Sequence, residues 1–127
     1  MKIYYLILSD GRKVRIEANW NTMVLFKDLS GIDFDEFGEL CLSKQVTERQ
    51  LRQMVYSCAL EGERLDGKAL GLTEEEFGGF LTLQTMAQFI NMFIAMTNPG
   101  ETPDKKKAPG TEPTFLTRMK RRLRGSI

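Results

Sequence analysis

"VTERQLRQMVYSCALEG", residues 46–62, carries the clearest helical pattern in the sequence. Thr47 and Gln50 stand three apart, which is the spacing of a capping box, in which each side chain accepts a bond from an otherwise unpaired backbone N–H. Apolar residues then recur at helical spacing, at Leu51, Met54, Val55, Cys58 and Ala59. Gly62 is predicted to lie just past the end of this helix. The segment predicts one long amphipathic helix, and the remaining elements are placed around it.

The N-terminal residues predict a β-hairpin. "KIYYLILS", residues 2–9, is rich in β-branched and aromatic side chains, and "KVRIEA", residues 13–18, alternates apolar with charged positions. Between them, Asp10-Gly11 readily adopts the positive φ angles of a tight turn. An isolated hairpin is only marginally stable in water, so we expect its apolar face to be covered by helices.

Residues 21–40, "NTMVLFKDLSGIDFDEFGEL", predict two short helices separated by a break. Asn19 or Asn21 can cap the first helix, and Gly31 can end it in the left-handed conformation. Asp33 can then cap a second helix that runs to about Leu42. Inward-facing positions are expected at Met23, Leu25, Phe26 and Leu29 in the first helix, and at Phe34, Phe37 and Cys41 in the second. We expect the acidic residues Asp35, Glu36 and Glu39 to face water, near the positive end of the helix dipole.

Residues 72–96 predict a helix that is interrupted and then unusually apolar. Thr73 and Glu76 form a capping pattern, and Gly78-Gly79 indicates a kink or break. The segment that follows is apolar on more than one face, so it is either buried on all sides or binds something. We favour a surface that faces a partner or a second copy over a purely internal core. The predicted partner-binding groove consists of Phe80, Leu83, Met86, Phe89, Ile90 and Phe93.

The last thirty residues differ from the rest in composition and charge. Residues 98–113 are rich in Pro, Gly, Thr and charge, which is typical of a flexible linker, and residues 114–124 regain a short helical pattern. From Glu101 onward the chain carries +5, which leaves −4 on the preceding residues because the total is +1. The predicted contact residues of this basic amphipathic tail are Phe115, Leu116, Arg118, Met119, Arg121, Arg122 and Leu123. A solvated tail, a protein contact, and binding to nucleic acid or lipid all stay open, and no aromatic residues are interleaved with the charges to favour nucleic acid.

Composition predicts a globular protein and argues against an enzyme. The chain has 42% hydrophobic and 28% charged residues and no histidine, which removes the commonest general base and metal ligand. Cys41 and Cys58 lie in no CxxC motif and are expected to be reduced and buried. The acidic residues of "DFDEFGE" fit no calcium-binding loop. We therefore expect no cofactor and no metal. The N-terminus lacks the pattern of a signal peptide, and no apolar run approaches the roughly 20 residues that cross a membrane.

These elements predict an α+β fold, in which an N-terminal β-hairpin packs on a small bundle of three to four helices and a flexible basic tail follows. With 127 residues, the chain is long enough for one core. We expect a folded domain at residues 1–97, followed by a linker and tail at 98–127.

The order of these segments resembles the tail assembly chaperones of long-tailed bacteriophages and prophages. The resemblance covers residues 1–97. It rests on the N-terminal hairpin, on "MVLFKDLSGIDF" with its pattern Phe-Lys-x-Leu-[Ser/Thr]-Gly-x-Asp, and on "LRQMVYSCALEGERLDGKALGLTEEEF" with its Tyr-x-x-Ala-Leu core. Nothing in residues 98–127 matches a motif of that family.

The resemblance implies a non-enzymatic protein in the cytoplasm of the bacterial host. Such a chaperone binds the hydrophobic, helical tape measure protein before tail tube protein polymerises around it, and some members form homo-oligomers. Two other functions stay open: a nucleic-acid-associated accessory protein that uses its basic tail, and a structural adaptor that remains in the phage tail. A membrane is not among the expected partners, and nucleic acid is expected only under the first alternative.

Overall fold

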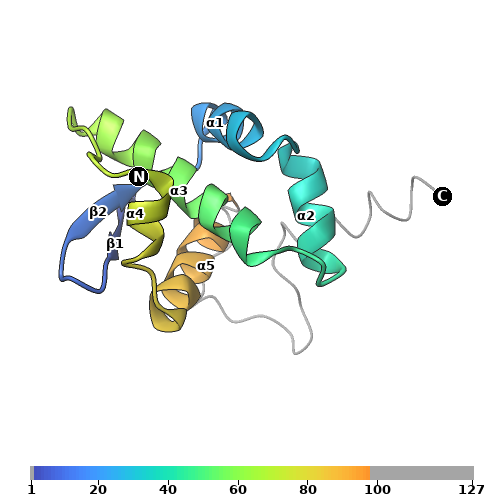
Figure 1. The fold of residues 1–127 in the computed structure, drawn as a ribbon. Coiled ribbons are helices and arrows are strands. Elements are labelled where there is room, and N and C mark those ends of the chain that lie inside the picture. The colour runs from blue at the N-terminus through green and yellow to red at the C-terminus, as the bar shows by residue number, and fades with distance from the viewer. Residues whose placement is uncertain (1, 98–127) are drawn as a thin grey trace.

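A computed structural model describes residues 2–97 of the chain, which form a β-hairpin and five helices (Figure 1). The elements are β1 (Tyr4–Ile7), β2 (Lys13–Ile16), α1 (Trp20–Ser30), α2 (Phe34–Leu42), α3 (Glu48–Leu65), α4 (Glu74–Gly78) and α5 (Leu83–Thr97). The predicted α+β class, with a hairpin followed by helices, is confirmed. The predicted linker and tail lie outside the described residues.

The hairpin forms where the sequence predicts it. β1 and β2 pair antiparallel, with Leu6 opposite Val14. Both of these side chains are fully buried, whereas Tyr5 on the other face is partly exposed. Gly11 has φ +89°, which a glycine adopts without strain, so the Asp-Gly turn is also confirmed.

Helix α3 lies at the centre of the fold, with the hairpin on one side and α1 on another (Figure 1). Gly62 is a residue of this helix, which continues to Leu65, so the prediction that Gly62 follows the helix end is wrong. Its role is close packing: a Cβ atom at Gly62 would overlap the Arg15 carbonyl and lie 2.8 Å from Ile16 Cα. Only glycine allows α3 to approach the backbone of β2 this closely.

Helices α1 and α2 begin and end at the predicted signals. Asn19 caps α1, and Gly31 ends it with φ +82°. The buried side of α1 differs from the prediction, because Leu29 is 38% exposed whereas Thr22 is fully buried. A buried hydroxyl is tolerated here because Thr22 Oγ1 donates to the carbonyl of Glu17 at 2.6 Å.

The glycine pair separates α4 from α5, which confirms the predicted break. α4 ends at Gly78, and α5 begins at Leu83. The connection is fixed to the hairpin, since the Ser9 N–H donates to the Phe80 carbonyl at 3.0 Å. This bond holds the start of α5 beside the turn of the hairpin.

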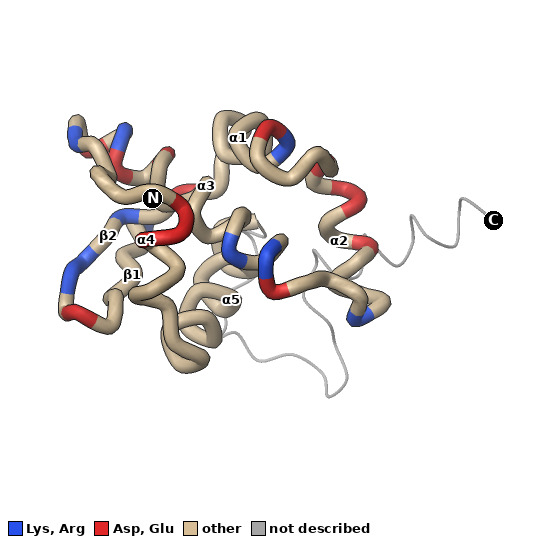
Figure 2. Tube along the Cα trace, in the orientation of Figure 1, with Lys and Arg blue, Asp and Glu red and all other residues tan. Residues whose placement is uncertain are grey.

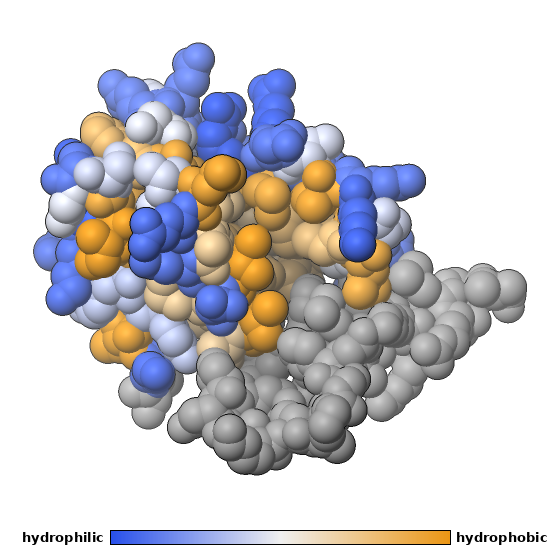
Figure 3. All heavy atoms as spheres, turned by 90° about the horizontal axis from the view of Figure 1, so that it is seen from below, coloured by the Kyte–Doolittle hydropathy of each residue, from blue (hydrophilic) through white to orange (hydrophobic). Residues whose placement is uncertain are grey.

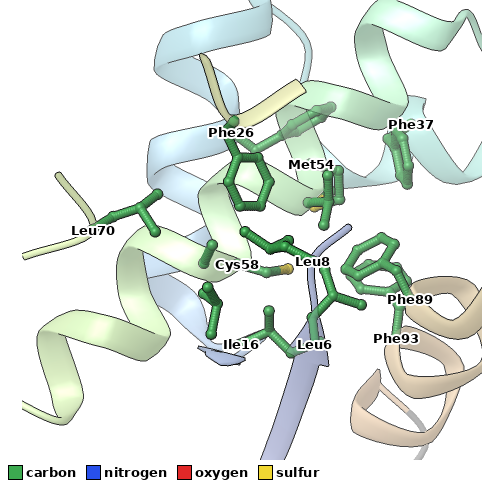
Figure 4. Close-up of a cluster of buried hydrophobic side chains, with 14 residues drawn as sticks. Leu6, Leu8, Ile16, Phe26, Phe37, Met54, Cys58, Leu70, Phe89 and Phe93 are labelled. Atoms are coloured by element: carbon green, nitrogen blue, oxygen red, sulfur yellow. The ribbon is translucent and has the colours of Figure 1, made fainter. Parts of the chain in front are cut away.

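The core lies where the hairpin, α1, α2, α3 and α5 meet (Figure 4). Aromatic rings dominate one side of it: Phe26 meets Phe37 edge-on with ring centroids 5.0 Å apart, and Phe89 and Phe93 of α5 lie 5.5 Å apart. Figure 4 shows both α5 rings pointing toward Leu6 and Leu8 of the hairpin. Aromatic contacts of this kind add to the stabilisation that burial alone provides.

A buried carboxylate joins α3 to the start of α1. The side chain of Glu61 is 1% exposed and accepts hydrogen bonds from Arg64, Asn19 and Asn21 at 2.7–3.2 Å. These donors, Arg64 first, lower the pKa of Glu61 to about 2 against the opposing effect of burial. The carboxylate therefore stays ionised and fixes the position of the α1 cap.

Candidate docking groove

An apolar groove lies between the N-terminal end of α3, the end of α4 and the outer side of α5. Its volume is about 480 Å³. We call it the α3–α5 groove, and its lining residues are Glu48, Leu51, Arg52, Gly78, Leu81, Leu83, Met86, Ala87 and Ile90. Figure 3 shows the described domain from below, where hydrophobic residues gather on the face that carries α5. The groove is open to solvent and is the candidate functional site.

Three of the six predicted groove residues line this surface. Leu83 is 93% exposed, Ile90 is 41% exposed and Met86 is half-buried. With Ala87 they occupy positions i, i+3, i+4 and i+7 of α5, so they form one continuous stripe. An apolar stripe that faces water is the feature expected of a binding surface rather than of a core.

The other three predicted residues are placed differently. Phe89 and Phe93 are 1% and 6% exposed and point into the core, four residues apart on the opposite side of α5. Phe80 is half-buried in the connection before α5, where the guanidinium of Arg12 lies 5.7 Å from its ring centroid. The structure therefore divides the apolar surface of α5 into a core side and a groove side.

Leu51 and Leu81 complete the groove and were not predicted to belong to it. The sequence pattern places Leu51 on the inward stripe of α3, and it is the first residue of that stripe, half-buried at the helix end. Leu81 follows the glycine pair in the short connection. Neither position carries a local signal for binding, because each joins the groove only when the fold brings α3, α4 and α5 to the same face.

The polar rim of the groove is balanced in charge. Arg52 Nε donates to Glu74 Oε2 at 2.7 Å, and the stem of Arg52 lies against Gly78. Glu48 and Arg52 are the two charged residues in the lining. A surface with an apolar floor and a nearly neutral rim suits an apolar helix better than a highly charged ligand.

The titratable groups of the described residues include two thiols and one phenol with raised pKa values. Among residues 2–97, no group of three or more His, Cys, Asp or Glu side chains is placed to hold a metal ion. Burial raises the pKa of the Cys41 thiol to about 11 and raises that of Cys58 as well. Burial also raises the pKa of Tyr56, whose hydroxyl donates to the Leu72 carbonyl at 2.6 Å. The lining of the α3–α5 groove is mainly apolar.

The predicted tail contacts lie outside the described residues. They are Phe115, Leu116, Arg118, Met119, Arg121, Arg122 and Leu123. Within residues 2–97, no helix combines the length and apolar character needed to cross a bilayer. In comparisons with known proteins, no family model matches the chain, and no curated protein or solved structure is significantly similar to it.

Proposed function

We propose that this protein is a non-enzymatic tail assembly chaperone of a long-tailed phage or prophage, and that the α3–α5 groove binds the tape measure protein. The observation that carries the proposal is the apolar stripe on α5, in which Leu83 and Ile90 are exposed and Met86 is half-buried. The hairpin and helices also follow one another in the order on which the resemblance rests. The proposed place of action is the cytoplasm of the bacterial host. Tail tube protein and a second copy of the chain are further proposed partners.

The proposed mechanism is physical. A tape measure helix exposes an apolar face that aggregates in water, and the groove covers part of that face. Burial contributes roughly 25 cal/mol per Å² of apolar area, and the lost freedom of the two partners offsets much of this gain. The result is weak and reversible binding, which suits a chaperone because its client must later be released to the growing tube.

The test first requires the client, which is the proposed tape measure protein. It is identified as a very long helical protein encoded by a gene next to the gene of this chain. The client is co-expressed with the wild-type chain and with the double variant Leu83→Glu, Ile90→Glu. We expect the wild type to keep the client soluble and to co-purify with it, and the variant to lose both effects. The reason is that two carboxylates in the groove would have to be desolvated on binding.

Leu65→Glu is the matched control for this experiment. Leu65 is 42% exposed, close to the 41% of Ile90, and it lies at the other end of α3 from the groove. Circular dichroism establishes that all variants are folded. Equal client solubility with the wild type and the groove variant would refute the assigned groove. Detection of the chain in purified virions would instead indicate a structural adaptor of the tail.

A further inference from the structure

A second apolar groove lies between α1 and the start of α2, apart from the α3–α5 groove. Its volume is also about 480 Å³, and we call it the α1–α2 groove. Trp20, Met23 and Val24 supply much of its apolar lining, with Trp20 81% exposed and Val24 49% exposed. Covering a tryptophan buries a large apolar area with little loss of side-chain freedom, so this floor can contribute strongly to binding.

The rim of the α1–α2 groove is acidic. Asp28, Asp33 and Asp35 line it, and Lys27 is the one cation among its lining residues. The acidic surface continues along α2, where a neighbouring hollow is also lined by Glu36 and Glu39. Figure 2 shows these acidic positions at the end of α1 and along α2. The preferred occupant is therefore an apolar segment with positive charge, unlike the nearly neutral helix suited to the α3–α5 groove.

The chain itself contains a segment of this chemistry. In residues 114–124, Leu116, Met119 and Leu123 recur at helical spacing and form a narrow apolar stripe. The positions around the stripe include five cations: Arg118, Lys120, Arg121, Arg122 and Arg124. The apolar stripe of this segment matches the apolar floor of the α1–α2 groove, and the surrounding cations match its acidic rim.

The described domain also ends close to the groove. Phe93, in the last turns of α5, has its ring centroid 6.1 Å from that of Phe34 and 6.3 Å from that of Phe37, both in α2. The last described turns of α5 therefore lie beside α2. Residues 98–113 can span up to about 50 Å when extended, more than enough to return to a groove on the same domain. A tether of this kind gives a local concentration in the millimolar range, so even a weak contact is populated.

We propose that residues 114–124 bind as a basic amphipathic helix in the α1–α2 groove of the same chain. The tail covers Trp20 and leaves the α3–α5 groove open. This inference does not depend on the proposed chaperone function, because it rests on charge, apolar pattern and chain length alone.

Tryptophan fluorescence of the full-length chain tests the proposal directly, because Trp20 is the only tryptophan and lies in the groove. The perturbation is the triple variant Arg118→Glu, Arg121→Glu, Arg122→Glu. We expect wild-type emission at shorter wavelength, and less quenching by acrylamide, than in this variant. Raising the salt concentration should move the wild type toward the variant, because salt screens exposed charge pairs.

Two controls separate docking from a general effect of charge. Lys105→Glu, Lys106→Glu, Lys107→Glu makes the same change in net charge within the linker, and we expect it to leave the emission nearly unchanged. Val24→Lys alters the groove at an exposed position. In the Val24→Lys background, the tail variant should no longer shift the emission, because the tail is already displaced.

Three results would overturn the proposal. The wild type and the tail variant could show the same emission and quenching, in which case the tail does not cover Trp20. The difference could vanish on dilution by about a hundredfold, in which case the tail binds a second copy, since a tethered contact is independent of concentration. The tail variant could lose salt-sensitive binding to DNA without any change in the emission of Trp20, in which case the tail binds nucleic acid and not the groove.

Discussion

Glu61→Gln provides a quantitative test of the buried carboxylate that fixes α1 to α3. Glutamine keeps the shape of the side chain and removes its charge. The folded protein lowers the pKa of Glu61 from 4.5 to about 2. Each pKa unit corresponds to about 1.4 kcal/mol, so the shift amounts to roughly 3 kcal/mol. Arg64 is 60% exposed, and screening by water around it reduces the expected contribution to about 2 kcal/mol.

The sign of the pH dependence follows from the lowered pKa. A carboxylate with a depressed folded-state pKa stabilises the fold fully above its unfolded value of 4.5, and this contribution disappears as the pH falls toward 2. At pH 7, wild type should therefore exceed Glu61→Gln by about 2 kcal/mol in free energy of unfolding, and at pH 3 by about half of that or less.

Urea denaturation of both proteins at pH 7, 5, 4 and 3, followed by circular dichroism, measures this difference. The m-values should agree between the two proteins, so that the change is assigned to stability. A difference that stays constant from pH 7 to pH 3 would refute the reasoning, because it would show that the charge of Glu61 is not what the folded state stabilises. Equal stability at pH 7 would refute it as well.

Two further predictions concern close packing and thiol chemistry. Gly62→Ala should destabilise the fold by about 2 kcal/mol or more in urea denaturation, because the added Cβ meets the backbone of Arg15. Gly78→Ala should be nearly neutral, because its added Cβ meets the movable side chain of Arg52. Equal effects of the two substitutions would contradict the close packing of α3 on β2. At pH 8, Cys41 should react slowly with iodoacetamide and Cys58 only after denaturation, as mass spectrometry of the alkylated chain would show, since burial raises the pKa of both thiols. Rapid labelling of Cys58 in the native protein would contradict its placement in the core.

Features that depend on neighbouring residues could be predicted from the sequence. The Thr47–Gln50 capping box and the left-handed Gly31 are set by residues three or four apart, and both appear as expected. The hairpin follows from the β-branched and aromatic residues before Gly11 and from the alternation of apolar and charged residues after it. In each case the groups that form the interaction lie within one turn of helix or one tight turn of backbone.

Features set by distant contacts could not be predicted. Gly62 faces β2, which lies far upstream in the chain, and nothing local distinguishes that role from a helix end. Apolar residues lie on more than one face of α5, so the sequence does not show which face is buried. Phe89 and Leu83 therefore look equivalent in sequence, although Phe89 is buried and Leu83 is exposed. The α3–α5 groove also includes Leu51, which reaches it only because the fold brings the start of α3 to the face that carries α5.

The close approach of β2 to α3 also bears on how the chain is made. The hairpin is synthesised before α3, so its apolar face lacks the cover that α3 provides until the segment around Gly62 has left the ribosome. The Glu17 N–H donates to the Cys58 carbonyl at 3.0 Å, so this hydrogen bond also forms only after α3 has emerged. The hairpin is thus exposed to proteases and to cellular chaperones until α3 has emerged from the ribosome. A product terminated before α3 would lack the helix that packs on β2 and on α1.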